Sequence, residues 1–213
     1  MSAENTPLLP KAALDRLKAG NARYVQNVRS IDSMLSHSHR ELLLQPQTPF
    51  AIVLGCSDSR APAEIVFDQG LGDLFVIRVA GNIVAPSQVG SVEFAAERFG
   101  TPLVVVMGHT SCGAIQATLE AIGQSEKPAP ALRNLMSIVN RVRPAIEGLM
   151  ATELARDPVR LAREAMRANV RAAVSHLRHG SEILERLAEQ GGLAVVGCEL
   201  DLATGEVHFF DDL

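Results

Sequence analysis

Residues 50–60 read FAIVLGCSDSR, an apolar run followed at once by a cysteine, an aspartate and an arginine. Residues 103–113 repeat this layout as LVVVMGHTSCG, with a histidine and a second cysteine after the apolar run. Continuous apolar runs of this length are typical of strands buried on both faces, as in a parallel sheet covered by helices. The residues that carry chemistry therefore follow directly on two buried strands.

The same periodicity along the rest of the chain predicts an α/β fold. Four apolar runs predict a mostly parallel sheet of four strands: 50–55, 74–80, 103–108 and 193–197. Residues 207–210, after a turn, predict an added C-terminal antiparallel strand. Flanking helices are expected over 10–29, 38–44, 87–99 (with Ser87 as the N-cap), 113–122 and most of 131–190.

Composition narrows the class of protein. With 213 residues, 47% of them hydrophobic, the chain is expected to form one domain, 1–213, with a helical N-terminal arm over about 8–45. A net charge of -4 gives no basic footprint and argues against nucleic acid as a partner. No apolar run approaches the roughly 20 residues of a membrane span, and no secretory signal is evident. Three cysteines, two of them in the motifs, favour a reducing, cytoplasmic location.

The two motifs together offer a set of metal ligands. Cys56, His109 and Cys112 supply two thiolates and an imidazole, which zinc prefers. If the two strands are neighbours, the three side chains converge at the carboxyl edge of the sheet. Three protein ligands with an open fourth position are typical of a catalytic zinc, and Asp58 and Arg60 would add an acid/base group and its ion-pair partner. A structural zinc with Asp58 as a permanent fourth ligand is the alternative.

Both motifs resemble the zinc-binding signatures of the β-class carbonic anhydrases, and the resemblance covers nearly the whole chain. Further matching segments are DQGLGDLFVIRVAGN (68–82), GSVEFA (90–95), NARY (21–24) and LATG (202–205). The resemblance implies one zinc ion per chain, bound by Cys56, His109 and Cys112. It also implies the reversible hydration of carbon dioxide to bicarbonate and a proton by a zinc-bound hydroxide.

The resemblance also assigns roles to residues around the metal. Asp58 would accept a hydrogen bond from the hydroxide, and Arg60 would hold Asp58 in place. Gln69 and the N–H group of Gly113 would bind the oxygen atoms of the substrate. In a closed form of the site, Asp58 would itself become the fourth zinc ligand.

The same resemblance also predicts the oligomeric state and suggests alternative functions. Family members are dimers or tetramers whose N-terminal helices embrace the partner subunit, so a homo-oligomer is expected. Arg78 matches one residue of a regulatory bicarbonate pocket, but the chain has no Trp and Leu200 stands in place of a Tyr, so that pocket is not expected. Two alternatives remain: hydrolysis of carbon disulfide or carbonyl sulfide on the same scaffold, and a non-catalytic zinc-binding protein. The Asp58/Arg60 pair argues against the second.

Overall fold

The computed structural model describes residues 8–30, 44, 46–123, 133–211 and 213. The helix expected over 38–44 lies outside these residues except for its last position.

The centre of the molecule is a five-stranded sheet in the order β2-β1-β3-β4-β5. Strands β1 (Ala51–Gly55), β2 (Leu74–Arg78), β3 (Leu103–His109) and β4 (Ala194–Leu200) pair in parallel, and β5 (Val207–Phe209) pairs with β4 in antiparallel fashion. This confirms the predicted sheet. Strand β4 extends past the predicted end at residue 197, because Glu199 and Leu200 pair with the last two residues of β3.

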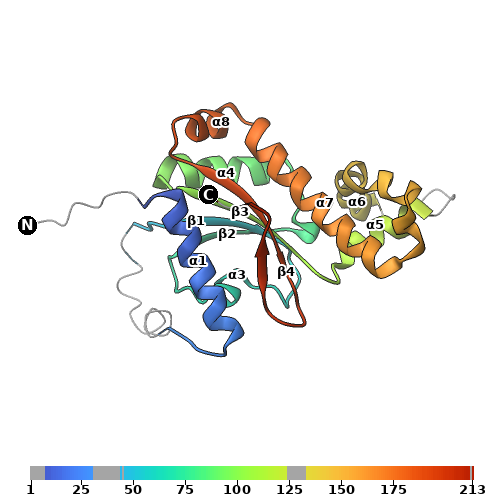
Figure 1. The fold of residues 1–213 in the computed structure, drawn as a ribbon. Coiled ribbons are helices and arrows are strands. Elements are labelled where there is room, and N and C mark those ends of the chain that lie inside the picture. Colours follow the sequence, from blue (N-terminus) through green and yellow to red (C-terminus); the bar gives the residue numbers. More distant parts are fainter. Residues whose placement is uncertain (1–7, 31–43, 45, 124–132, 212) are drawn as a thin grey trace, which may run out of the picture.

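Helices cover both faces of the sheet, as Figure 1 shows. They are α1 (Pro10–Val25), α3 (Ala63–Val66), α4 (Pro86–Phe99), α5 (Gly113–Gly123), α6 (Arg133–Ile146), α7 (Pro158–His179) and α8 (Glu182–Glu189). The short 3-10 helices η2 (Ala80–Asn82), η4 (Glu147–Ala151) and η5 (Glu153–Arg156) also lie within the described residues. Among the described helices, none has both the length and the apolar character needed to cross a membrane.

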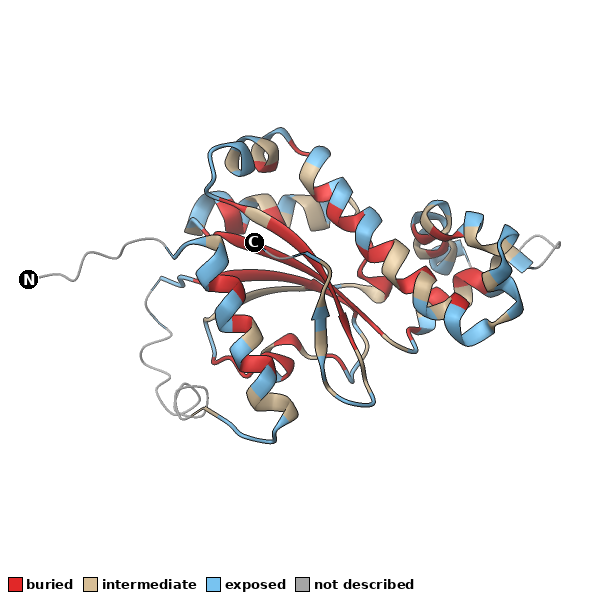
Figure 2. Ribbon diagram, viewed as in Figure 1, coloured by how far each residue is buried: buried red, intermediate tan, exposed pale blue. Residues whose placement is uncertain are grey.

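Side chains alternate between the two faces of each strand and divide the core in two. Ile52 and Leu54 of β1 face the residues of α4, α5, α6, α7 and α8, whereas Ala51 and Val53 face α1 and α3. The edge strands β2 and β5 are mostly only partly buried, whereas β1, β3 and β4 are buried along almost their whole length, as Figure 2 shows in red. This two-sided burial explains why their sequences are continuous apolar runs.

Helix α1 packs closely against the C-terminal end of α3. A Cβ atom at Gly20 would stand 1.8 Å from the carbonyl oxygen of Phe67, so only glycine fits there. Leu14 and Leu17 are buried on the same side, and Asn21 donates to the carbonyl groups of Val66 and Gly205. The apolar face of the N-terminal helix is therefore covered by its own subunit.

Two predicted helix boundaries were wrong. Helix α1 ends at Val25, before the predicted residue 29. Helix α4 begins at Pro86, with Ala85 as its N-cap, so Ser87 lies inside the first turn and makes no cap. Proline at the first helical position is already fixed near the helical φ angle, so it sets the start of this helix.

Candidate metal centre and active site

Two neighbouring strands bring the predicted ligands to one edge of the sheet. Strands β1 and β3 pair directly, so Cys56, just after β1, and His109, the last residue of β3, end side by side. Cys112 lies immediately before α5. The ligand atoms of the three side chains lie within 4.8 Å of one another, and all three residues are buried. A single ion at about 2.0–2.3 Å from each donor fits such a group.

His109 is placed so that its Nε2 atom could bind a metal. Its Nδ1 lies 2.9 Å from the carbonyl oxygen of Thr110, which makes Nδ1 the donor and directs Nε2 toward the cysteines. Within the described residues, the buried Nε2 has no hydrogen-bond partner. Burial opposes a charge on this ring, but the Cys56 thiolate and the Thr110 carbonyl outweigh it and raise the pKa of His109. An unpaired buried nitrogen is costly, and a bound metal satisfies it.

The two thiols share one proton in the absence of a metal. The pKa of Cys56 falls to about 4, chiefly because the Cys112 thiol donates a hydrogen bond to its sulfur. Burial opposes this shift. The N–H of Gly81, 3.4 Å from the sulfur of Cys56, also donates to it and lowers the pKa further. Donation to Cys56 and burial raise the pKa of Cys112. Cys56 is therefore a thiolate at neutral pH, and a divalent cation can take the place of the shared proton.

The loop that contacts Cys56 is itself held from α7. Gly81 has a φ angle of 69°, and a Cβ atom there would stand 2.9 Å from the Cβ of Ala114. Its carbonyl group accepts a hydrogen bond of 2.9 Å from Nδ2 of the buried Asn169, on α7. This contact joins residues 88 positions apart, so no local pattern in the sequence indicates it.

Asp58 and Arg60 form a close pair at the rim of the cluster. Nε of Arg60 lies 2.9 Å from Oδ1 of Asp58, and Nη2 lies 2.7 Å from Oδ2. The Arg60 guanidinium holds the pKa of the Asp58 carboxyl far below its usual range. Oδ2 is 3.9 Å from Nε2 of His109. The carboxylate is thus ionised, next to the three ligands and turned toward Arg60.

Arg78 fixes the ligand loop from the neighbouring strand. Its Nε donates to the carbonyl oxygen of Cys56 at 2.9 Å, and its Nη2 donates to that of Asp58. Arg78 pairs with Gly55 in the sheet register, so its long side chain reaches the turn that follows β1. This role depends on the register of β1 and β2, which the sequence alone does not give.

The two predicted substrate-binding residues differ in their surroundings. The amide nitrogen of Gln69 donates to the carbonyl of Phe67 at 2.6 Å, and its oxygen accepts from Nε of Arg16 on α1 at 3.1 Å. These bonds hold Gln69 against α1, and the structure does not bring it into the three-ligand group. Gly113, in contrast, directly follows Cys112 and begins α5, with open space at the position of a Cβ atom.

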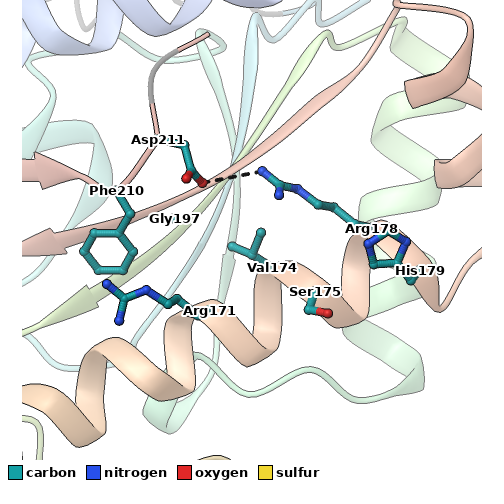
Figure 3. Close-up of a pocket in the computed structure, with 8 residues that line it drawn as sticks. All are labelled: Arg171, Val174, Ser175, Arg178, His179, Gly197, Phe210 and Asp211. Carbon is teal, nitrogen blue, oxygen red and sulfur yellow. Dashed lines mark ion pairs between the residues drawn. The ribbon is translucent and has the colours of Figure 1, made fainter.

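A cavity adjoins the metal cluster on the side of α7. It has a volume of about 560 Å³, and Cys112 and Gly113 form part of its wall. A smaller cavity of about 260 Å³ lies between α7 and the C-terminal segment and is lined by Arg171, Arg178 and Asp211, among others (Figure 3). None of the predicted site residues lines this second cavity, so the first marks the candidate site.

Comparisons with known proteins agree with this geometry. A family model for carbonic anhydrases matches residues 51–207. The chain is 40% identical over 199 residues to a carbonic anhydrase of Mycolicibacterium smegmatis, covering 93% of this chain and 92% of that protein. It is 40% identical over 205 residues to carbonic anhydrase 2 of Mycobacterium tuberculosis, covering 96% and 94% of the two chains.

Solved structures show the same fold. The crystal structure of a β-carbonic anhydrase of the fungal pathogen Aspergillus fumigatus matches with a TM-score of 0.70 at 27% identity, over 84% of this chain and 85% of that one. One of two tetrameric β-carbonic anhydrases of Sordaria macrospora matches with a TM-score of 0.72 at 22% identity, over 92% and 95% of the two chains.

Proposed function

Since this chain belongs to the β-class carbonic anhydrase family and is an enzyme of that family, we propose that it catalyses the reversible hydration of carbon dioxide to bicarbonate and a proton, with one zinc ion per chain. The observation that carries the proposal is the buried group of Cys56, His109 and Cys112, with the Asp58–Arg60 pair at its rim.

The donor set fits zinc. Two thiols that share a proton and an unpaired imidazole nitrogen provide three ligands of the kinds that zinc prefers, and they leave a fourth position open. When bound there, zinc lowers the pKa of a coordinated water and supplies a nucleophile near neutral pH. Hydrogen bonds from Arg78 and Gly81 would hold the Cys56 segment in position for this.

Asp58 and Arg60 orient the nucleophile. The Asp58 carboxylate accepts a hydrogen bond from the attacking water and so directs an oxygen lone pair toward the carbon of carbon dioxide. Arg60 keeps Asp58 ionised and fixes both of its oxygens. The same bonds support an open site over one in which Asp58 is a permanent fourth ligand. Release of Asp58 from Arg60 would produce the closed form.

Gly113 and Gln69 are the proposed substrate contacts. The N–H of Gly113, at the start of α5, donates to a substrate oxygen on which negative charge develops. Gln69 can contribute only if its amide leaves Phe67 or Arg16, so its role requires a rearrangement of these bonds.

We also propose that the enzyme is at least a dimer. Strands β2 and β5 form the two edges of the sheet, and an edge strand can pair with a strand of a second copy of the chain. The embrace of a partner by the N-terminal helices remains part of this proposal. All three cysteines are free thiols, which supports a reducing location such as the cytoplasm.

Parallel assays of one metal-analysed preparation test the function. Hydration of carbon dioxide, hydrolysis of carbon disulfide and hydrolysis of carbonyl sulfide are measured on the same zinc-loaded protein. We expect hydration to be faster than either hydrolysis by orders of magnitude. Faster hydrolysis of a sulfur compound would assign the site to that substrate instead, and bound zinc without any of the three activities would indicate a binding protein.

A further inference from the structure

The cavity beside Cys112 and Gly113 has a charged opposite wall. The first turns of α7 form this wall, and Arg163 is the residue there with a permanent charge. Within the described chain, the other lining residues are apolar or uncharged apart from the Cys112 thiol, and no carboxylate lines the cavity. An anion in this space therefore meets a guanidinium and no lining carboxylate.

A buried carboxylate fixes the position of that guanidinium. Glu199 on β4 is fully buried, and its Oε1 accepts a 2.6 Å hydrogen bond from Nε of Arg163. Its Oε2 accepts an equal 2.6 Å bond from Nε of Arg167, one helical turn further along α7. Since Glu199 pairs with Gly108 of β3, it ties α7 to the strand that carries His109.

The bond to Glu199 leaves the far end of Arg163 available. Its side chain is 42% exposed, and Nη2 lies 3.9 Å from the carboxylate of Asp201. In the part of the chain that the structure describes, Nη1 has no hydrogen-bond partner. A guanidinium whose terminal nitrogens donate no hydrogen bond can bind a planar oxyanion through two hydrogen bonds. Asp201 moderates the attraction, so a weak and exchangeable site is expected.

We propose that Arg163 is a binding residue for bicarbonate, the anionic member of the reaction, in the cavity beside the metal centre. This inference rests on the proposed function. Carbon dioxide carries no charge and bicarbonate carries one, so Arg163 acts on only one side of the reaction. The cavity of Figure 3 differs in its lining: Arg171 and Arg178 line it, but so does Asp211, whose carboxylate lies 3.5 Å from Arg178.

Two matched variants test the proposal. Arg163→Gln and Arg167→Gln each remove one charge and one bond to Glu199 from the same helix, but only Arg163 lines the cavity. On zinc-loaded protein at fixed pH and ionic strength, we measure product inhibition of hydration by bicarbonate. We also measure the bicarbonate concentration that gives half of the maximal shift in melting temperature, which does not depend on activity.

The expected result separates the two arginines. In Arg163→Gln, we expect the inhibition constant for bicarbonate and the bicarbonate concentration for the half-maximal melting shift each to rise about three- to tenfold, as for the loss of a partly exposed charged contact. In Arg167→Gln, both quantities stay within about twofold of the wild type. Arg163→Lys, which keeps the charge without the planar fork, falls between. Similar melting temperatures of the two Gln variants without ligand show that the fold is equally affected.

The following results would overturn the assignment of Arg163 as a bicarbonate-binding residue. Equal changes in the two Gln variants, or none, would restrict Arg163 to its bond with Glu199. A changed sedimentation coefficient in Arg163→Gln with unaltered bicarbonate binding would make this wall a subunit contact. Failure of the wild type to hydrate carbon dioxide is a separate result: it would refute the proposed function, whereas the melting shift would still report on the anion site.

Discussion

Arg60 holds Asp58 through two parallel hydrogen bonds, from Nε to Oδ1 at 2.9 Å and from Nη2 to Oδ2 at 2.7 Å. Bidentate pairs of this kind are among the stronger and more directional contacts between charged side chains. The pair keeps the carboxylate ionised while it lies 3.9 Å from Nε2 of His109. A hydrogen-bond acceptor is therefore fixed beside the three proposed metal ligands and is held by Arg60.

Replacement of Asp58 by Asn should separate metal binding from catalysis. The amide has nearly the same shape, but it lacks the charge and presents a donor in place of one acceptor. We expect kcat/KM for hydration to fall by about 10²–10⁴-fold, the range for loss of a positioned acid/base group, with the zinc content unchanged. Hydration rates and metal analysis of the same samples check this. Wild-type activity in Asp58→Asn would remove Asp58 from the mechanism.

Substitution of a proposed zinc ligand should lower the zinc content of the protein, whereas substitution of the third cysteine, Cys198, should not. We expect Cys112→Ser and His109→Ala to lose most of their zinc on dialysis, from about one ion per chain, because only two ligands remain. Cys198→Ala is the matched control: Cys198 is also fully buried, but it does not belong to the metal-ligand group, and burial raises the pKa of its thiol. Zinc is measured by atomic emission. Loss of zinc from Cys198→Ala alone would move the metal site elsewhere.

Because α1 lies so close to the carbonyl oxygen of Phe67, adding one methyl group at Gly20 should lower the stability of the fold. In Gly20→Ala, the added carbon meets the carbonyl oxygen of Phe67, so the helix must shift; a cost of about 1–3 kcal/mol in the free energy of unfolding is expected. Gly90→Ala on α4 is the control, since open space surrounds that position and alanine favours a helix. Urea unfolding compares the two. Equal stability would mean that α1 does not pack as described.

The role of Gln69 can be decided from both ends of one hydrogen bond. Gln69→Leu and Arg16→Leu both break the bond between these side chains and should lower stability. If Gln69 also contacts the substrate, KM for hydration rises in Gln69→Leu and not in Arg16→Leu. The same KM in both variants would limit Gln69 to holding α1. Steady-state kinetics with melting curves make the comparison.

Local patterns in the sequence were enough to predict the fold and the convergence of Cys56, His109 and Cys112. The strands were predictable because burial on both faces leaves continuous apolar runs, and the convergence of Cys56 with His109 followed from the rule that parallel strands end at one edge. Ser87 was misread as a helix cap because the stronger signal was the adjacent Pro86.

Contacts between distant segments were beyond sequence reasoning. The hydrogen bonds from Arg78 to the turn after β1 depend on the β1–β2 register. The hydrogen bond from Asn169 to Gly81 depends on how α7 crosses the sheet. Glu199 lies two residues past the predicted end of the last parallel strand, at residue 197. Its burial between two arginines required β4 to extend to Leu200 and α7 to lie over it.

Stopped-flow hydration of carbon dioxide by the wild type tests the central claim most directly. The protein is assayed between about pH 6.5 and 9 as purified, after removal of zinc with a chelator, and after zinc is restored. The account predicts activity that rises with pH, disappears with the metal and returns with one zinc per chain. Fully zinc-loaded protein that hydrates no carbon dioxide at any of these pH values would contradict it.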